Sequence, residues 1–258
     1  MRGEICVGSA TFLSLASLLF LIFMHVGQTG TATVPRNIAM INVNLTTFGT
    51  GLEAVIAPDP VDGLYTDNAS APLQRRAGLR QEYKFGLYSY CAYVNKTAGL
   101  CSNSSAANRF QPYEAITEDM LANYSTITFA IFNPPPTFLD SSYLGNFSNG
   151  AYYLLLLGTI FTALSLFTGV AKHTLAFLLS TLFAILGSLM LLIGATIWTV
   201  IIKKAQSVND IVVGPASAPI PLGIEVTIGS ALYLAWAAFG CLVVSVIPYM
   251  ISCCTYRG

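Results

Sequence analysis

Four long apolar runs dominate the pattern of hydrophobic and polar positions along the chain. They cover residues 5–26, 152–171, 174–202 and 226–252, and none of them contains Asp, Glu, Lys or Arg. At 1.5 Å per residue, a helix of about 20 residues crosses the roughly 30 Å hydrocarbon layer of a bilayer. The pattern therefore predicts four transmembrane helices.

One long polar stretch, residues 27–151, separates the first run from the second. Within it, residues 37–47 alternate apolar and polar side chains, and residues 127–132 are rich in β-branched and aromatic side chains, so both are predicted to be strands. Residues 112–123 are predicted to form a short helix, and residues 57–76, rich in Pro, Asp, Gly and Ala, an irregular surface. The expected fold is an all-α four-helix membrane bundle with a small extracellular antiparallel sheet on the outer ends of the helices.

Composition and charge agree with a membrane protein. Of the 258 residues, 54% are hydrophobic and only 9% are charged, far below the roughly 25% charge of a soluble domain. Nine of the twelve acidic and seven of the twelve basic residues lie in residues 27–151. The net charge is zero, so nothing indicates a nucleic-acid partner.

Sequons for N-glycosylation determine the expected topology. About two Asn-X-Ser/Thr sequons would occur by chance, but six are present, all in residues 27–151, at Asn44, Asn68, Asn95, Asn103, Asn123 and Asn146. This stretch is therefore expected to face the lumen and then the cell exterior, with both chain ends in the cytoplasm, as Arg2 before the first run also suggests. A cleaved signal peptide is an alternative interpretation of residues 1–26, and it leaves the next segment on the same side.

Cys91 and Cys101 are the only cysteines in this polar stretch. Strand-forming residues flank a turn that carries the Asn95 sequon, so the two cysteines are predicted to face each other across antiparallel strands. In an oxidising compartment they should form a disulfide, which would stabilise the fold by roughly 3 kcal/mol. Two free thiols are the alternative.

The connections between the later runs are short. Only Lys172 and His173 separate the second run from the third, which predicts a tight turn on the cytoplasmic side between antiparallel helices. Trp198, near the outer end of the third run, fits the aromatic belt of a membrane interface. Residues 203–225 form the predicted second extracellular loop.

The tail, residues 253–258, is predicted to be cytoplasmic and begins with Cys253 and Cys254. Cysteines next to a membrane span are candidates for S-palmitoylation. Free thiols are again the alternative.

No residue pattern indicates catalysis, a cofactor or a metal. The spans contain no acidic residue, which argues against an ion-coupled transporter, and no catalytic or phosphate-binding motif is present. The carboxylate pairs Asp59 with Asp62 and Glu118 with Asp119 are expected to be solvated surface. The remaining possibility is a non-enzymatic protein that packs against lipids or other proteins.

Several motifs in order resemble the fungal Sur-seven/PalI family of four-span plasma-membrane proteins. They are ProArgAsnIle at residues 35–38, GLYSYC at residues 86–91 followed by Cys101, the near-absent loop at Lys172, AlaTrpAla at residues 235–237 and the terminal cysteine pair. The motif positions singled out are Gly86, Leu87 and Tyr88.

The resemblance implies a claudin-like, left-handed four-helix bundle under an extracellular antiparallel sheet that the Cys91–Cys101 bond holds. Claudins carry Trp beside the Gly-Leu pair, whereas this chain has Lys84 or Phe85 before it and Tyr88 after it. Formation of tight-junction strands is therefore not implied.

The resemblance also implies a function. Family members are associated with stable cortical membrane domains (eisosomes), cell-wall integrity and sphingolipid balance. The expected role is a non-enzymatic plasma-membrane glycoprotein that organises such a domain or serves as accessory subunit of a pump, channel or cell-wall synthase. Its expected partners are the bilayer with its sphingolipid or sterol, a larger integral membrane protein or a second copy, and the cell wall. A component of alkaline-pH sensing is the alternative, and a pore or transporter is the third hypothesis.

Overall fold

The computed structural model describes residues 2–56, 60–132, 135–171 and 173–255. The chain forms two compact units. The helical unit comprises Met1–His25, Gly150–Ile197 and Ala231–Gly258, and the sheet unit comprises Val26–Asn149 and Trp198–Ser230.

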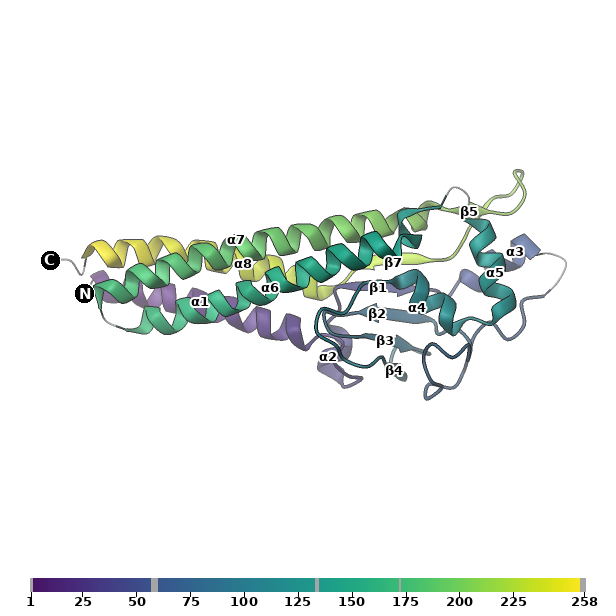
Figure 1. Ribbon diagram of the computed structural model, residues 1–258, viewed down its shortest axis with the longest axis horizontal. Helices are drawn as coiled ribbons and strands as arrows, with labels where there is room; N and C mark the ends of the chain where they lie inside the picture. The colour runs from purple at the N-terminus through teal and green to yellow at the C-terminus, as the bar shows by residue number, and fades with distance from the viewer. Residues whose placement is uncertain (1, 57–59, 133–134, 172, 256–258) are drawn as a thin grey trace. The chain divides into compact units, whose positions relative to one another are not determined.

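Four long helices supply the helical unit. They are α1 (Arg2–Val26), α6 (Ser141–Val170), α7 (Thr174–Ala205) and α8 (Ser230–Thr255), drawn in Figure 1. Each contains a stretch that is long and apolar enough to cross a membrane. The four expected apolar helices are therefore present, although α6 begins at Ser141 and not at Tyr152.

Hydrogen bonds from small polar side chains join neighbouring helices within this unit. Ser17 Oγ on α1 donates to the Ala238 carbonyl on α8 at 2.8 Å. Ser180 Oγ on α7 donates to the Ser165 carbonyl on α6 at 2.7 Å. Such bonds contribute about 0.6 kcal/mol each in a membrane bundle. They therefore orient the helices more than they stabilise them.

Glycines bring α6 and α7 into close contact. A Cβ atom at Gly158 would lie 2.7 Å from the Leu191 side chain, and one at Gly194 would lie 3.0 Å from the Leu155 side chain. The order of these contacts along the chain makes the two helices antiparallel, and small residues at such contacts are typical of membrane helices. Lys172, in the predicted turn between them, lies outside the described residues.

A five-stranded antiparallel sheet forms the centre of the sheet unit. The spatial order of its strands is β4-β3-β2-β1-β7, as Figure 1 shows. The strands are β1 (Ile41–Asn44), β2 (Glu82–Phe85), β3 (Tyr90–Tyr93), β4 (Gly99–Cys101) and β7 (Glu225–Ile228). Val43 on β1 pairs with Tyr83 on one side and with Val226 on the other. The sheet thus combines the polar stretch before α6 with the loop between α7 and α8.

The other elements of the sheet unit are short. They are α2 (Thr33–Asn37), α3 (Phe48–Ile56), α4 (Pro112–Asp119), α5 (Ala122–Ile131), the 3-10 helices η1 (Thr137–Leu139) and η2 (Gln206–Asp210), and the hairpin strands β5 (Val212–Val213) and β6 (Ile220–Pro221). The predicted short helix at residues 112–123 corresponds to α4, which ends at Asp119. Residues 60–81 contain no helix or strand beyond an isolated bridge between Tyr65 and Leu79.

Two predicted elements differ from the structure. The predicted strand at residues 127–132 is wrong, because residues 127–131 belong to α5, where Tyr124 and Thr128 are buried one helical turn apart. Packing at this helical spacing outweighs the local β-branched content. Residues 226–228, included in the predicted fourth apolar helix, form β7, and α8 begins at Ser230.

A polar clamp from η2 fixes the edge strand β7. The Asn209 side chain accepts a hydrogen bond from the Val226 amide at 2.7 Å and donates to the Val226 carbonyl at 3.0 Å. Gln206 Nε2 donates to the same carbonyl at 3.2 Å. These side chains satisfy backbone groups on the side of β7 that no strand covers.

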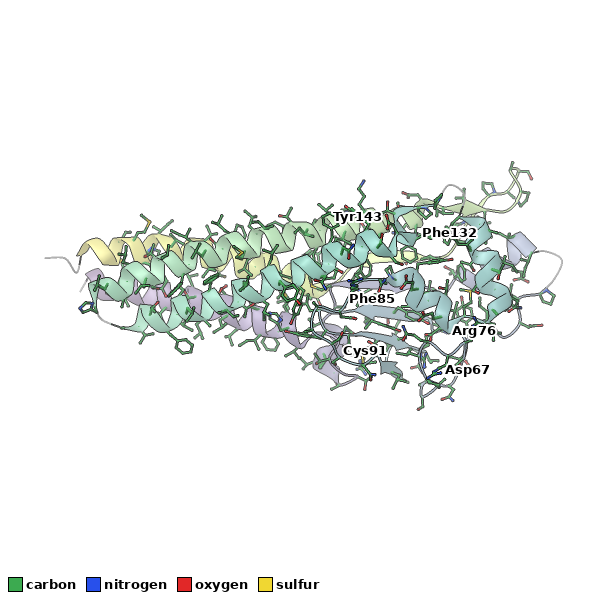
Figure 2. All side chains as sticks on the ribbon, viewed as in Figure 1. Asp67, Arg76, Phe85, Cys91, Phe132 and Tyr143 are labelled. Carbon is green, nitrogen blue, oxygen red and sulfur yellow. A yellow bond between two sulfur atoms is a disulfide. The ribbon has the colours of Figure 1, made fainter. Side chains whose placement is uncertain are left out.

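Aromatic side chains fill the core of the sheet unit. The ring of Phe85, labelled in Figure 2, stacks on Tyr90 with centroids 5.3 Å apart and meets the edge of Phe110 at 5.1 Å. The ring centroids of Trp198 and Phe110 lie 6.1 Å apart, and Trp198 is only 1% exposed. The predicted place of Trp198 in an interfacial belt is therefore wrong, because protein packing covers its indole ring.

A buried ion pair connects the segment before β2 with the end of α4. Arg80 and Asp119 are both fully buried, and Arg80 Nη1 lies 3.4 Å from Asp119 Oδ2. The Tyr83 hydroxyl donates to the same oxygen at 2.7 Å, and the Gln74 amide donates to the other at 2.5 Å. Burial raises the pKa of the Asp119 carboxyl, while these two donors and the charge of Arg80 oppose the shift. The carboxylate is thus surrounded by groups that compensate its charge.

This pair corrects one prediction about surface carboxylates. Glu118 is exposed as expected, but its neighbour Asp119 lies in the core. A helix turns successive side chains by about 100°, so adjacent acidic residues can face opposite environments. Of the other predicted pair, Asp62 is exposed and Asp59 lies outside the described residues.

We predict that Arg80→Met destabilises the sheet unit by about 3–5 kcal/mol, because it leaves Asp119 as a buried charge without its partner. Hydrogen–deuterium exchange of the β2 and β3 amides in the full-length protein measures the effect. Lys96→Met is the control, since Lys96 is exposed and its replacement should change the stability by less than about 0.5 kcal/mol. Equal effects of the two substitutions would contradict the assignment of Arg80.

Candidate functional site

Two of the sequence motifs, ProArgAsnIle and GLYSYC, meet around one side chain, Gln28. It follows the end of α1 by two residues and has a left-handed backbone conformation with φ of 57°. We define the Gln28 junction as Gln28 with the residues that its side chain and carbonyl contact, namely Pro35, Arg36, Ile38, Ser89, Cys91 and Tyr93. All of these belong to the sheet unit.

The side-chain amide of Gln28 organises the segment around α2. Its Nε2 group donates to the carbonyls of Pro35, Arg36 and Ile38 at 3.0, 3.0 and 2.9 Å. The Gln28 backbone amide also donates to the Pro35 carbonyl at 3.0 Å. Gln28 is fully buried. Its side chain is the donor to the half-buried Arg36 and Ile38 carbonyls, whereas the Pro35 carbonyl also accepts from the Ile38 amide.

The other groups of Gln28 hold the β3 segment. Its carbonyl accepts a hydrogen bond from Ser89 Oγ at 2.5 Å, and its Oε1 atom lies 3.1 Å from the Tyr93 hydroxyl, which donates to it. Cys91 Sγ lies 3.3 Å from the same carbonyl. Gln28, two residues after the end of α1, is therefore fixed directly to the GLYSYC element.

Close packing explains the glycine of that element. A Cβ atom at Gly86 would lie 2.5 Å from the Gly27 carbonyl oxygen and 2.9 Å from Gln28 Cβ. Leu87 is 1% exposed in the core, and the Tyr88 carbonyl accepts a hydrogen bond from the Ser105 amide at 2.8 Å. The three motif positions thus serve packing and backbone pairing.

A disulfide joins Cys91 on β3 to Cys101 on β4. The two residues are directly paired in the antiparallel register, with Asn95 in the connecting turn. Figure 2 labels Cys91 within the sheet. Because β4 is a three-residue edge strand, the covalent bond keeps it paired where few backbone hydrogen bonds could.

All six asparagines of the predicted sequons are exposed, and all lie in the sheet unit. Five lie outside the long apolar helices, while Asn146 lies in the second turn of α6. Each acceptor nitrogen is thus accessible to an attached glycan. Cys253 and Cys254 fall in the last turn of α8, where the side chains lie outside the described part of the chain.

Burial favours the neutral form of Tyr93 in the junction and of two further tyrosines of the sheet unit. Burial raises the pKa of Tyr93 to about 12, with the charge of Arg36 opposing and that of Glu82 adding to the shift. Burial likewise raises the pKa of Tyr83 and Tyr90. A phenol with a raised pKa donates hydrogen bonds and is a poor nucleophile. Among the described residues, no group of three His, Cys, Asp or Glu side chains could hold a metal.

Sequence reasoning did not identify Gln28, Arg80 or Asn209. Each is a single polar residue whose role depends on distant backbone groups, and no local pattern marks it. The one available signal is the position of Gln28 between an apolar helix and the ProArgAsnIle motif.

Comparison with known proteins agrees with the motifs gathered here. The model of the SUR7/PalI family matches residues 6–248, which is nearly the whole chain. No curated protein matches the chain.

We predict that Gln28→Leu destabilises the sheet unit by about 1–3 kcal/mol, because the part-buried carbonyls of Arg36 and Ile38 lose their side-chain donor, whereas the Pro35 carbonyl keeps the backbone amides of Gln28 and Ile38. Amide exchange in the full-length protein should accelerate in β3 and around α2. Gln81→Leu changes an exposed glutamine and is the control, with an expected change near zero. Normal protection in the Gln28 variant would show that the junction is dispensable.

A second prediction concerns alkaline pH. The folded pKa of Tyr93 lies above its unfolded value of about 10. The contribution of neutral Tyr93 to the free energy of unfolding is therefore complete below pH 10 and is lost as pH rises through about 12. Each such tyrosine lowers the free energy of unfolding by about 1.4 kcal/mol per pH unit in this window. Denaturant titrations from pH 7 to 11 should show a constant stability up to pH 9 and a decline above pH 10.

Tyr93→Phe should reduce the slope of that decline by the contribution of one tyrosine, about 1.4 kcal/mol per pH unit. A decline that already begins near pH 8, or an unchanged slope in the variant, would contradict the role assigned to the buried hydroxyl.

Proposed function

The chain belongs to the SUR7/PalI family, and on this premise we propose that it is a non-enzymatic plasma-membrane tetraspan that acts by lateral contact. In this proposal it organises a cortical membrane domain or serves as accessory subunit of a larger membrane protein, such as a pump, a channel or a cell-wall synthase. Sphingolipid or sterol, a second copy and the cell wall are further proposed contacts.

The low burial of the four apolar helices carries this proposal. Between 22% and 39% of the most apolar 18-residue window of each helix is buried within the chain. Large apolar side chains point outward on every helix, among them Phe12, Phe167, Leu175, Tyr233 and Ile247. Most of the helix surface is therefore free to contact lipid or a neighbouring membrane protein.

The proposed topology places the sheet unit outside the cytosol and both chain ends inside. Six exposed sequon asparagines and the Cys91–Cys101 disulfide support this placement, since glycosylation and disulfide formation both belong to the secretory route. In this arrangement the Gln28 junction keeps the sheet unit rigid where it follows α1. Rigid presentation lets a small domain contact the outer parts of a partner with little loss of conformational entropy.

The tyrosines of the sheet unit bear on the alternative role in alkaline-pH sensing. A sensor that responds near pH 8 needs a group with a pKa close to that value. Burial instead moves the pKa of Tyr83, Tyr90 and Tyr93 upward. The upward shift of these pKa values favours the role in lateral contact over the role in alkaline-pH sensing.

Site-specific photo-crosslinking tests the proposal. Phe167 is 72% exposed on α6, whereas the adjacent Leu166 is 8% exposed, so a photoreactive side chain at position 167 should capture a partner and one at position 166 should not. We expect a discrete adduct of defined mass at position 167 in native membranes. The absence of any discrete adduct at position 167, together with a monomer without stoichiometric partner or lipid as the sole species in native nanodiscs, would overturn the proposal.

A further inference from the structure

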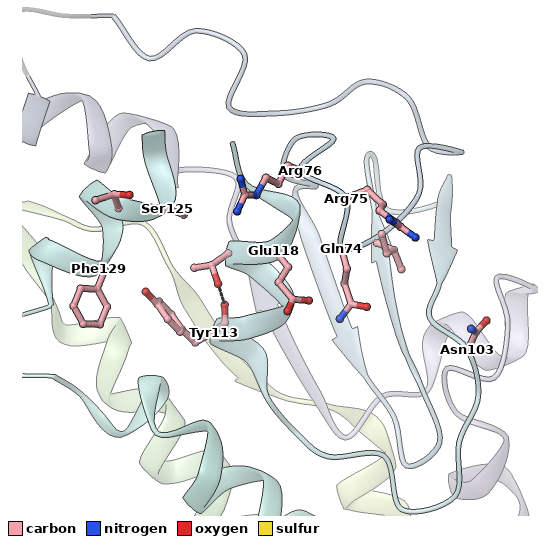
Figure 3. Close-up of a pocket in the computed structure, with 11 residues that line it drawn as sticks. Gln74, Arg75, Arg76, Asn103, Tyr113, Glu118, Ser125 and Phe129 are labelled. Atoms are coloured by element: carbon pink, nitrogen blue, oxygen red, sulfur yellow. Dashed lines mark hydrogen bonds between the residues drawn. The ribbon is translucent and has the colours of Figure 1, made fainter. Parts of the chain in front are cut away.

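A polar groove of about 980 Å³ lies in the sheet unit, close to the upper end of the range for ligand pockets in proteins. Figure 3 shows the groove between the loop at residues 73–76 and the helices α4 and α5. Neither the Gln28 junction nor the proposed lateral contacts use this surface. The residues that carry the argument are Gln74, Arg75, Asn103, Tyr113, Glu118 and Phe129.

The loop that forms one wall of the groove is preorganised. Gln74 and Arg76 both have left-handed backbones, with φ of 60° and 55°, a conformation that is uncommon outside glycine and tends to occur at functional sites. The amides of Gln74, Arg76 and Gly78 donate to the end of α4, at Asp119 Oδ1, the Glu118 carbonyl and the Asp119 carbonyl, at 2.5, 2.9 and 2.9 Å. The wall is therefore in place before any ligand binds.

The polar groups of the groove suit an uncharged ligand rich in hydroxyls. Gln74 and Arg75 supply planar donors, and the Glu118 carboxylate supplies acceptors. The guanidinium groups of Arg75 and Arg76 and the carboxylate of Glu118 line the same groove, so its charges are mixed and do not form a site of one sign for a phosphate or a cation. A hydroxyl group both donates and accepts and can satisfy either neighbour.

Aromatic side chains provide the apolar part of the site. Phe129 on α5 lines the groove and is 65% exposed, and Tyr113 on α4 lines it as well. Figure 3 shows both rings on the same side of the groove. A pyranose ring has an apolar C–H face and a hydroxylated edge, so it matches an aromatic surface bordered by planar polar groups.

Two sequons border the same groove. Asn103, whose sequon is completed by Ser105, is itself a lining residue. Ser125, another lining residue, completes the sequon of Asn123. A glycan on Asn103 would therefore begin at one end of the groove, and its outer sugars would have to extend along the groove to reach Phe129 at the other end, as Figure 3 shows.

We propose that this groove binds a carbohydrate chain. The chain's own N-glycan on Asn103 and a separate extracellular oligosaccharide offer the same chemistry, and the experiment below distinguishes these two sources. The inference rests on the proposed function in one respect, which is the placement of the sheet unit outside the cytosol.

The first arm measures protection of the protein's own glycan. Full-length protein from a glycosylating eukaryotic host is digested with an endoglycosidase under native conditions, and mass spectrometry follows each site. If the groove holds the Asn103 glycan, its removal should be about tenfold slower than that of the Asn68 glycan, because cleavage requires the unbound state. Phe129→Ala should abolish the difference, whereas Val55→Ala, which truncates an exposed apolar side chain on α3, should preserve it.

The second arm tests an external source. Ser105→Ala removes the Asn103 sequon and keeps the asparagine, and Ser70→Ala does the same at Asn68 as the matched control. An oligomannose or β-1,3-glucan oligosaccharide is then added, and saturation-transfer NMR detects binding. Binding to the Ser105→Ala protein that disappears with Phe129→Ala would identify an external chain as a ligand. Protection in the first arm without such binding would identify the protein's own glycan.

Equal removal rates at both sites together with no oligosaccharide binding would overturn the inference. If other sequons carry glycan in that case, the proposed topology still stands and only the groove assignment fails. If no sequon carries glycan and the sheet unit is found in the cytosol, the proposed function fails first. The two failures are therefore distinguishable.

Discussion

The hydrogen bonds of one buried amide connect the motifs of the sheet unit. Gln28 satisfies three carbonyls around α2 with its side chain, and its own carbonyl accepts a hydrogen bond from Ser89 in the segment that carries the disulfide. These carbonyls belong to half-buried residues, and the loss of their donor costs up to about 1–3 kcal/mol, which is a large part of the stability of a small domain. Motifs separated by some fifty residues, at Pro35 and Gly86, therefore act together through this contact.

The two units use polar groups in different ways. In the sheet unit, buried charges and amides such as Arg80, Asp119 and Gln28 are surrounded by specific partners, which fixes one arrangement of strands and loops. In the helical unit, hydroxyls such as Ser17 and small residues such as Gly158 join helices whose other faces are apolar. This division fits a protein with a defined polar domain and a large apolar contact surface.

Much of the architecture follows from strong patterns in the sequence. The apolar runs predict the four long helices, and the spacing of Cys91 and Cys101 predicts the paired strands. Tertiary context decides the remainder. Residues 127–131 are β-branched and aromatic yet helical because Tyr124 and Thr128 are buried one turn apart, and residues 226–228 are apolar yet form β7 because β1 offers an unpaired edge. Gln28 and Asp119 could not be identified, because their partners are distant backbone or side-chain groups.

The state of the two sheet cysteines in living cells tests most directly the account of a folded, oxidised domain outside the cytosol. Intact cells are treated with a membrane-permeant alkylating agent and lysed without reductant, and the peptides are mapped by mass spectrometry. The account predicts that the Cys91 and Cys101 peptides are recovered as one disulfide-linked pair without alkylation. Recovery of both cysteines as alkylated thiols would contradict it.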